Sequence, residues 1–191
     1  AMIIALAAAA LLSAFSRPAI AAGPVTLLLT SNLEGRFIPD IEGQETRDPM
    51  LLLGQSIIKE SKRGGVLYFD LGNSFYPGVL SKQNYGGAMM DFFRHFRCRS
   101  TLVSSMDLRI GVASLEFLRK QGGTALLSAN ILRDGSPLFT PYIIQEIQGR
   151  RVAFVGLSSK KILFDIAEKN VYRIAVEDEA KVLDAVIPAV A

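Results

Sequence analysis

The sequence predicts an α/β domain built on a mostly parallel β-sheet. From Pro24 onward, short β-rich runs alternate with longer segments that carry apolar residues at helical spacing. Near the C-terminus this alternation stops, and two strand-like runs follow each other around Gly149. The order is therefore β-α-β-α-β-α-β and then a β-hairpin, which indicates a parallel sheet that passes into a second or mixed sheet.

The first half of this pattern has clear local signals. Residues 25–30 (VTLLLT) form the first predicted strand. A helix follows within residues 48–65, with Pro49 at its first position and two glycines closing it. The second strand, residues 66–70 (VLYFD), is apolar enough to be covered on both faces, which is typical of a parallel sheet.

The second half repeats the scheme. We expect a helix over residues 85–96, a strand over 100–105 (STLVSS), a helix over 112–123 and a strand over 124–130 (TALLSAN). The hairpin is predicted from YIIQEIQ and RVAFVG on either side of Gly149, and a charged helix from about residue 178 to Pro188. Nothing in this stretch indicates a linker, so residues 24–191 are expected to form one domain.

Composition narrows the possible partners. The chain has 191 residues and a net charge of +3, from 21 basic and 18 acidic residues spread along its length. No basic stripe suited to nucleic acid results, so we expect no nucleic-acid partner. The single cysteine, Cys98, rules out an internal disulfide framework and a thiolate zinc cluster.

The N-terminus indicates export. Residues 2–15 are apolar apart from one serine, and Ala19 and Ala21 place small residues at −3 and −1 of a signal-peptidase site. We therefore predict a signal peptide over residues 1–21 and a periplasmic or secreted protein. Because nothing basic precedes Arg17, an uncleaved apolar anchor or a buried N-terminal helix stays open, and a membrane is a partner only if this segment is uncleaved.

Polar residues follow the predicted strands. The carboxyl ends of parallel strands meet at one edge of a sheet, where binding sites form. The residues expected at that edge are Asn32 and Glu34, Asn73, residues 105–107 and Asn130.

Four short motifs at these strand ends carry a family resemblance. They are residues 30–35 (TSNLEG), 70–75 (DLGNSF), 104–111 (SSMDLRIG) and 128–131 (SANI). In this order, and followed by the hairpin, they resemble the N-terminal half of the calcineurin-like metallophosphoesterase domain of 5′-nucleotidases and 2′,3′-cyclic-nucleotide phosphodiesterases. The family patterns are T-N-D-L-H-G, D-x-G-D-x-F, G-N-H-E-F-D-x-G and S-A-N-I. The resemblance spans residues 25–191 and implies an incomplete αββα sandwich with a mixed, mostly parallel sheet.

The resemblance also implies a chemistry that this chain does not match. The family is expected to use two divalent metal ions joined by a bridging carboxylate. Its bridging Asp falls on Asn73, and its first-strand Asp and His fall on Asn32 and Glu34. Its phosphate-orienting Asn falls on Ser105, and its leaving-group His on Met106, whose thioether transfers no proton. We therefore expect no catalytic residue and no metal cofactor, with vestigial site positions at Asn32, Glu34, Asn73, Ser105, Met106 and Asp107.

The remaining polar residues have simpler readings. Glu34, Asp70 and Asp107 could converge on one hard cation such as Mg²⁺ or Ca²⁺. Alternatively, Asp70 caps the following turn and Asp107 pairs with Arg109. We expect Asn130 to fix a turn, and the only histidine, His95, to be a partly exposed helix residue.

Two functions of different classes follow from these patterns. The first is an exported, non-catalytic module that serves binding or assembly, with a protein partner covering its incomplete sheet. The alternative is a metal-dependent, 5′-nucleotidase-type phosphoesterase of which this chain is an incomplete part. A nucleotide-binding protein without turnover is a third possibility that the sequence does not separate from the first.

Overall fold

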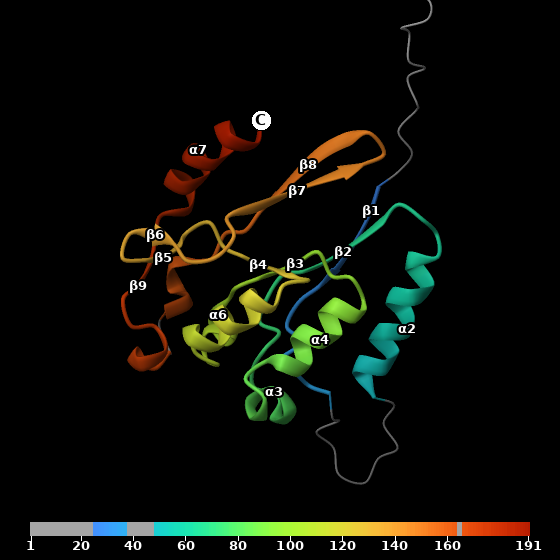
Figure 1. Cartoon of the computed structure of the whole chain (residues 1–191), viewed down its shortest axis with the longest axis horizontal. Helices are drawn as coiled ribbons and strands as arrows, with labels where there is room; N and C mark the ends of the chain where they lie inside the picture. The colour runs from blue at the N-terminus through green and yellow to red at the C-terminus, as the bar shows by residue number, and fades with distance from the viewer. Residues whose placement is uncertain (1–24, 38–47, 164–165) are drawn as a thin grey trace, which may run out of the picture.

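A four-stranded parallel sheet forms the centre of the computed structural model, which describes residues 25–37, 48–163 and 166–191 (Figure 1). The sheet order is β1-β2-β3-β4. These strands are Thr26–Thr30, Val66–Asp70, Ser100–Leu102 and Ala125–Leu127. The predicted α/β fold class is thereby confirmed, whereas the signal peptide predicted over residues 1–21 lies outside the described residues.

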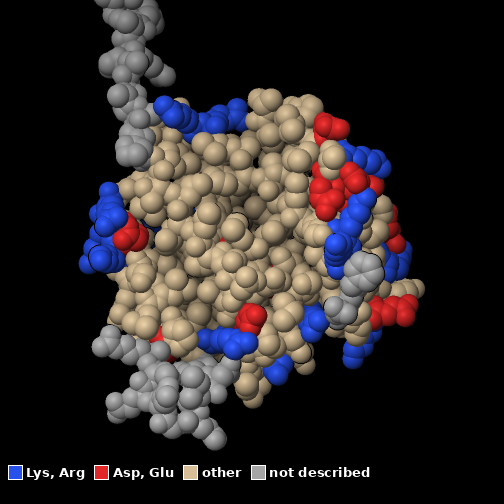
Figure 2. Space-filling view, turned by 180° about the vertical axis from the view of Figure 1, so that it is seen from behind, with Lys and Arg blue, Asp and Glu red and all other residues tan. Residues whose placement is uncertain are grey.

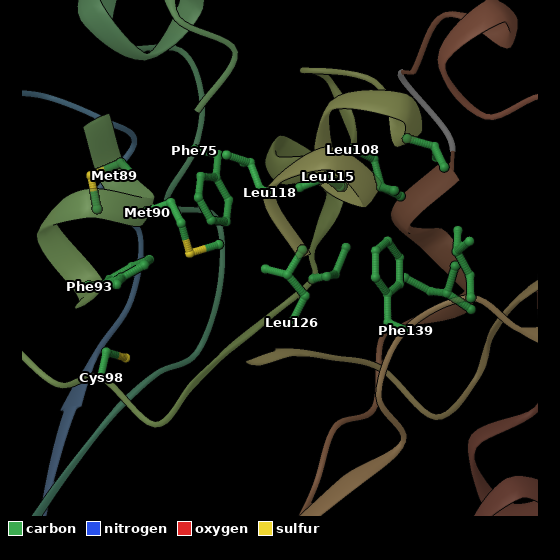
Figure 3. Close-up of a cluster of buried hydrophobic side chains, with 14 of the residues drawn as sticks. Phe75, Met89, Met90, Phe93, Cys98, Leu108, Leu115, Leu118, Leu126 and Phe139 are labelled. Atoms are coloured by element: carbon green, nitrogen blue, oxygen red, sulfur yellow. The ribbon is translucent and has the colours of Figure 1, made fainter. Parts of the chain in front are cut away.

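Helices cover one face of this sheet (Figure 1). They are α2 (Pro49–Ser61), α4 (Gly87–His95) and α6 (Val112–Gln121). As predicted, α2 begins at Pro49, and the Asp48 carboxylate accepts the backbone N–H of Met50 at 2.8 Å as a helix cap. Figure 3 shows the core between helices and sheet, where several large apolar side chains are fully buried: Phe75, Met89, Met90, Phe93, Leu108, Leu115 and Leu126.

Several predicted boundaries differ from the structure. Strand β4 ends at Leu127, three residues before the expected end at residue 130. Helix α4 starts at Gly87 and not at residue 85, because Tyr85 and Gly86 have left-handed φ values of 53° and 85°. A separate short helix, α3 (Val79–Gln83), precedes it. The third strand ends at Leu102, and α5 (Ser105–Leu108) begins where the strand was expected to continue, because Ser104 and Asp107 form a capping box.

The predicted hairpin is present and covers part of the other sheet face. β7 (Tyr142–Ile147) and β8 (Arg150–Val155) pair antiparallel through a two-residue turn. Both turn residues have positive φ, 50° and 75°, as a hairpin turn that matches strand twist requires. Phe154 stacks on Phe69 of β2 with ring centroids 4.1 Å apart, so β2 is buried from both sides as expected.

A small antiparallel sheet completes the described fold. Its order is β6-β5-β9, from Ser136–Pro137, Ile131–Arg133 and Ile174–Val176. Strands of two or three residues are too short to give a detectable period, which is why sequence patterns missed them. Two 3₁₀ turns, η1 (Lys160–Leu163) and η2 (Glu168–Asn170), and the C-terminal helix α7 (Glu179–Val190) follow the hairpin. None of the described helices combines the length and apolar character needed to cross a membrane.

The loop after β1 is held close to the start of α3. The backbone N–H of Gly78 donates to the Glu34 carbonyl at 2.6 Å. A Cβ at position 78 would collide with the Gly35 carbonyl, whereas a Cβ at Gly87 would meet only the Asn84 side chain at 3.6 Å. Glycine at position 78 therefore permits the close approach that places the β1 loop.

This contact gives a matched pair of substitutions. Gly78→Ala should lower the free energy of unfolding by about 1–3 kcal/mol, because two backbone segments must separate to admit the methyl group. Gly87→Ala, at the first position of α4, where the added methyl group makes only ordinary contacts with the Asn84 side chain, should leave the free energy of unfolding unchanged or raise it by up to about 1 kcal/mol. Urea unfolding followed by circular dichroism measures both. Equal effects from the two substitutions would contradict the role assigned to Gly78.

Candidate functional site at the strand ends

The loops after β1 and β2 are joined at the carboxyl edge of the sheet. The backbone N–H of Asn32 donates to the Gly72 carbonyl at 2.9 Å, and that of Glu34 to the Asn73 carbonyl at 3.1 Å. Asn32, Glu34 and Asn73 all adopt left-handed φ values, between 54° and 57°. Asparagine tolerates this region through local hydrogen bonding, whereas glutamate enters it at a greater conformational cost. The structure thus brings the predicted β1 and β2 site residues together.

The Asn73 side chain connects three loops. Its Oδ1 accepts the backbone N–H of Met106 at 3.1 Å, and its Nδ2 donates to Oδ1 of Asn32 at 3.0 Å. A backbone N–H can only donate, so the amide oxygen of Asn73 must face Met106 and its NH₂ group must face Asn32. Both ends of the amide are therefore engaged, and they join the loops after β1, β2 and β3.

The buried carboxylate of Asp107 binds the backbone of the loops after β2 and β3. Its fully buried carboxylate accepts the backbone N–H groups of Asn73, Ser74, Phe75 and Ser104 at 2.7–3.0 Å. Burial raises the pKa of Asp107 to about 6, against the lowering effect of these backbone hydrogen bonds. The predicted ion pair with Arg109 is not formed, because that guanidinium lies over the Tyr76 ring, 5.9 Å from its centroid.

Asp70 holds the ends of the strands together. Its buried carboxylate accepts Thr101 Oγ1 at 2.6 Å, Thr30 Oγ1 at 2.7 Å and Ser74 Oγ at 2.9 Å, and it caps the next turn through the Gly72 N–H at 2.9 Å. Turn capping by Asp70 is thereby confirmed. Burial raises its pKa, while the hydrogen bonds from Thr101 and Thr30 oppose that rise. The hydroxyl partners were not predicted, and their only signal was their position at the ends of neighbouring strands.

Glu34 points to a different partner. Its carboxylate pairs with Arg36, with Oε2 at 2.6 Å from Nη2 and 2.7 Å from Nε. The three carboxylates suggested for one hard cation do not converge. Among the described residues, no group of three or more His, Cys, Asp or Glu side chains is placed to hold a metal ion.

The other residues singled out from the sequence have structural roles in a helix, a turn or the loop junction. Ser105 opens α5, and Met106 contributes its backbone N–H to the loop junction. Asn130 is buried and, as predicted, fixes turns, because its amide bonds the Ser158 carbonyl at 2.6 Å and N–H at 2.8 Å. His95 is an exposed residue at the end of α4 with its ring edge-on to Phe96, which confirms the helix reading.

These residues do not fit a binuclear metal centre. Two dications need an anionic bridge between them, and the bridging position holds a neutral amide whose two ends are both hydrogen-bonded. The two nearby carboxylates, Asp70 and Asp107, are buried, and each accepts hydrogen bonds from four residues. The donor set favours a hydrogen-bonded loop junction over metal coordination.

The fold is shared with known phosphoesterases. No family model and no curated sequence match the chain. A Staphylococcus aureus protein assigned as a 5′-nucleotidase superposes with a TM-score of 0.75 at 16% identity, over 86% of this chain and 34% of that one. The 5′-nucleotidase precursor of Thermus thermophilus gives 0.68 at 19% identity, over 86% and 35%. The Bacillus subtilis calcineurin-like phosphoesterase YfkN gives 0.74 at 17%, over 86% and 57%.

These likenesses show that the chain has the fold of 5′-nucleotidases and calcineurin-like phosphoesterases, as the motifs implied. The chain spans about a third of the length of the two nucleotidases and just over half of YfkN. The expected incomplete form of the αββα sandwich agrees with this coverage, since a single helix layer and a hairpin flank the parallel sheet.

The buried carboxylates give a testable pH dependence. A carboxyl group whose pKa is higher in the folded than in the unfolded state stabilises the fold at low pH, and this contribution is lost as the pH rises through the folded pKa. For Asp107, whose folded pKa is about 6, the free energy of unfolding should rise by about 1 kcal/mol between pH 7 and pH 5, and Asp70 acts in the same direction. Urea titrations at the two pH values measure it.

A variant isolates the contribution of Asp107. Asp107→Asn removes the titrating group, so the rise between pH 7 and pH 5 should shrink, although the variant is less stable at both values because an NH₂ group then faces backbone donors. Glu177 and Asp178, whose pKa values are lowered by hydrogen bonds from Lys181 and Lys160, stay ionised over this interval. A wild-type protein that loses stability on acidification to pH 5 would contradict the assignment.

Proposed function

We propose that this chain is an exported, non-catalytic module that uses a metallophosphoesterase-like fold for binding or assembly. The observation that supports this most directly is the Asn73 amide, which bonds Asn32 and Met106 at the position where the resembling enzymes place a bridging carboxylate. Retention of the strand and turn pattern without the reactive groups is what selection for the scaffold alone would leave.

Repulsion between two metal ions would oppose formation of a binuclear centre in this chain. Two dications about 4 Å apart repel by roughly 15–20 kcal/mol even at an effective dielectric constant of 20. An anionic bridge offsets much of this repulsion, whereas the neutral Asn73 offers only a carbonyl dipole. Met106, at the position of the leaving-group histidine, has no exchangeable proton for acid catalysis.

Export and assembly are supported by features outside this junction. The apolar segment before Ala21 has the small residues of a signal-peptidase site, which supports a periplasmic or secreted location. Leu27 and Leu29 of β1 are 45% and 51% exposed on the sheet face opposite the helices, which supports a protein partner covering that face.

The second candidate is a metal-dependent phosphoesterase in which other polypeptide completes the active unit. It is supported by the fold of the neighbouring structures. It is also supported by the coverage, because this chain spans only about a third of the length of the two 5′-nucleotidases. Residues supplied from elsewhere would still meet a neutral amide at position 73, so we rank this candidate second.

Metal content and hydrolysis test the proposal. The purified protein should hold no stoichiometric Mn²⁺, Zn²⁺ or Fe, and it should not hydrolyse nucleotides or bis(p-nitrophenyl) phosphate when these ions are added. Chelator-sensitive turnover by the wild-type chain would refute the proposal and favour the second candidate.

A double substitution checks the role of the amide. Asn32→Asp/Asn73→Asp replaces a 3.0 Å hydrogen bond with two facing carboxylates, so its melting temperature should fall without metal and recover when Mn²⁺ is added. The wild-type melting temperature should not change when Mn²⁺ is added. Asn84→Asp, at an exposed position outside the junction, serves as the control. Its melting temperature should equal that of the wild type without metal and should not change when Mn²⁺ is added.

A further inference from the structure

A cavity of about 480 Å³ lies beside the start of helix α6, and none of the described residues that line it belongs to the strand-end junction. Its wall is formed by three separate parts of the chain: residues 110–114, Arg133 of β5, and the segment 169–173 between η2 and β9. Asn170 fixes two of these parts to each other, because its Nδ2 donates to the Arg109 carbonyl at 3.0 Å. Small-molecule sites have volumes of about 300–1,000 Å³, so this cavity has the size of a ligand site.

Basic side chains determine the charge of the cavity. Arg133, Lys169 and Arg173 line it, and no Asp or Glu does so among the described residues. Figure 2 shows that acidic and basic side chains gather together on the side of the molecule that carries β9 and α7. The lack of acids in the lining is therefore a local feature, and three cations at one cavity favour an anionic ligand.

Ion pairs hold the two arginines in place from outside the cavity. Nη1 of Arg133 donates to both carboxylate oxygens of Glu116, at 2.9 Å and 3.0 Å, and Nε of Arg173 donates to Asp134 at 2.6 Å. Each of these pairs engages one nitrogen of a guanidinium group that has five N–H donors, so both arginines keep donors for the oxygens of a ligand. Glu116 and Asp134 balance two of the three positive charges, which leaves a net charge of +1 from Lys169.

The cavity also has an aromatic and apolar part. Tyr172 lines it with 69% of its surface exposed, and Ile110 and Val112 contribute apolar side chains. An exposed tyrosine ring packs well against a planar group while its hydroxyl stays in water. Inorganic phosphate would fill only a small part of this volume, whereas a ligand with both an anionic and a planar group would contact both parts of the lining.

We propose that this cavity binds a small phosphate monoester that carries an aromatic group. Arg133, Lys169 and Arg173 bind the phosphate oxygens, and Tyr172 packs against the aromatic group. A phosphate monoester carries a charge of about −1.5 to −2 at pH 7 and three acceptor oxygens, which suits a lining with three cationic side chains. The inference rests on the binding role proposed above and names the site and the class of ligand.

Phenyl phosphate is the simplest probe of this class. Its titration into the isotope-labelled full chain in the presence of EDTA, followed by NMR of the backbone amides, should shift the signals of residues 110–114 and 169–173 with a dissociation constant on the order of 1 mM. Inorganic phosphate should bind at least about tenfold more weakly, because it does not contact Tyr172. Phenol, which is uncharged, should show no saturable binding up to about 10 mM.

Charge substitutions test the phosphate contact. Lys169→Gln removes a cation without breaking either arginine ion pair, so it should raise the dissociation constant of phenyl phosphate about three- to tenfold. Lys120→Gln makes the same change in charge at the other end of α6, outside the cavity lining, and should leave the dissociation constant within about twofold of wild type. Both lysines are exposed, so both variants are expected to fold.

Substitutions of Tyr172 test the aromatic contact. Tyr172→Ala should raise the dissociation constant of phenyl phosphate to that of inorganic phosphate, because the ring is lost. Tyr172→Phe keeps the ring and should stay within about twofold of wild type.

Two results would overturn the proposal. The first is an absence of amide shifts at the cavity with about 10 mM phenyl phosphate. The second is an equal loss of affinity in Lys169→Gln and Lys120→Gln, which would assign the attraction to the overall charge of the protein. Metal content and hydrolysis are measured on the same preparations. A metal-free, inactive chain without binding contradicts only this site, whereas chelator-sensitive turnover with binding intact contradicts only the non-catalytic function.

Discussion

The strand-end loops of this protein depend on one amide. Asn73 donates to Asn32 and accepts from the backbone of Met106, and these two bonds hold the loops after β1, β2 and β3 in one junction. Asp107 supports the same junction through four backbone N–H groups, two of them at Asn73 and Ser104. The fold is shared with phosphoesterases, and the position to which the sequence resemblance assigns a bridging carboxylate holds the neutral, hydrogen-bonded amide of Asn73.

The junction holds the strand-end loops through hydrogen bonds between residues of this chain. Left-handed backbone at Asn32, Glu34 and Asn73 is accompanied by hydrogen bonds between the neighbouring loops, which stabilise this turn shape. The buried Asp70 and Asp107 carboxylates are likewise used to fix backbone, since hydroxyl and N–H donors surround them. Polar residues at this edge therefore stabilise the geometry of the strand-end loops.

The sequence predicted the parallel sheet because its strands are short apolar runs ending in polar turns, and β2 was placed at its observed bounds. The capping box of Ser104 and Asp107 was not recognised from the sequence, so the predicted β3 extended past its observed end at Leu102. At the site, the expectation that reactive groups are missing came from residue types, because the Asn73 amide lacks the charge of Asp and the Met106 thioether lacks the exchangeable proton of His, and it stays a prediction. The contacts of Asp70 and Asp107 were not predictable in full, because they join residues more than 30 positions apart.

The most direct test is anomalous diffraction from crystals grown with excess Mn²⁺. We expect the Asn73 amide to stay hydrogen-bonded to Asn32 and to the Met106 N–H, with no anomalous peak beside it. Two peaks about 3.5–4 Å apart, with the side chain of residue 73 between them, would contradict it.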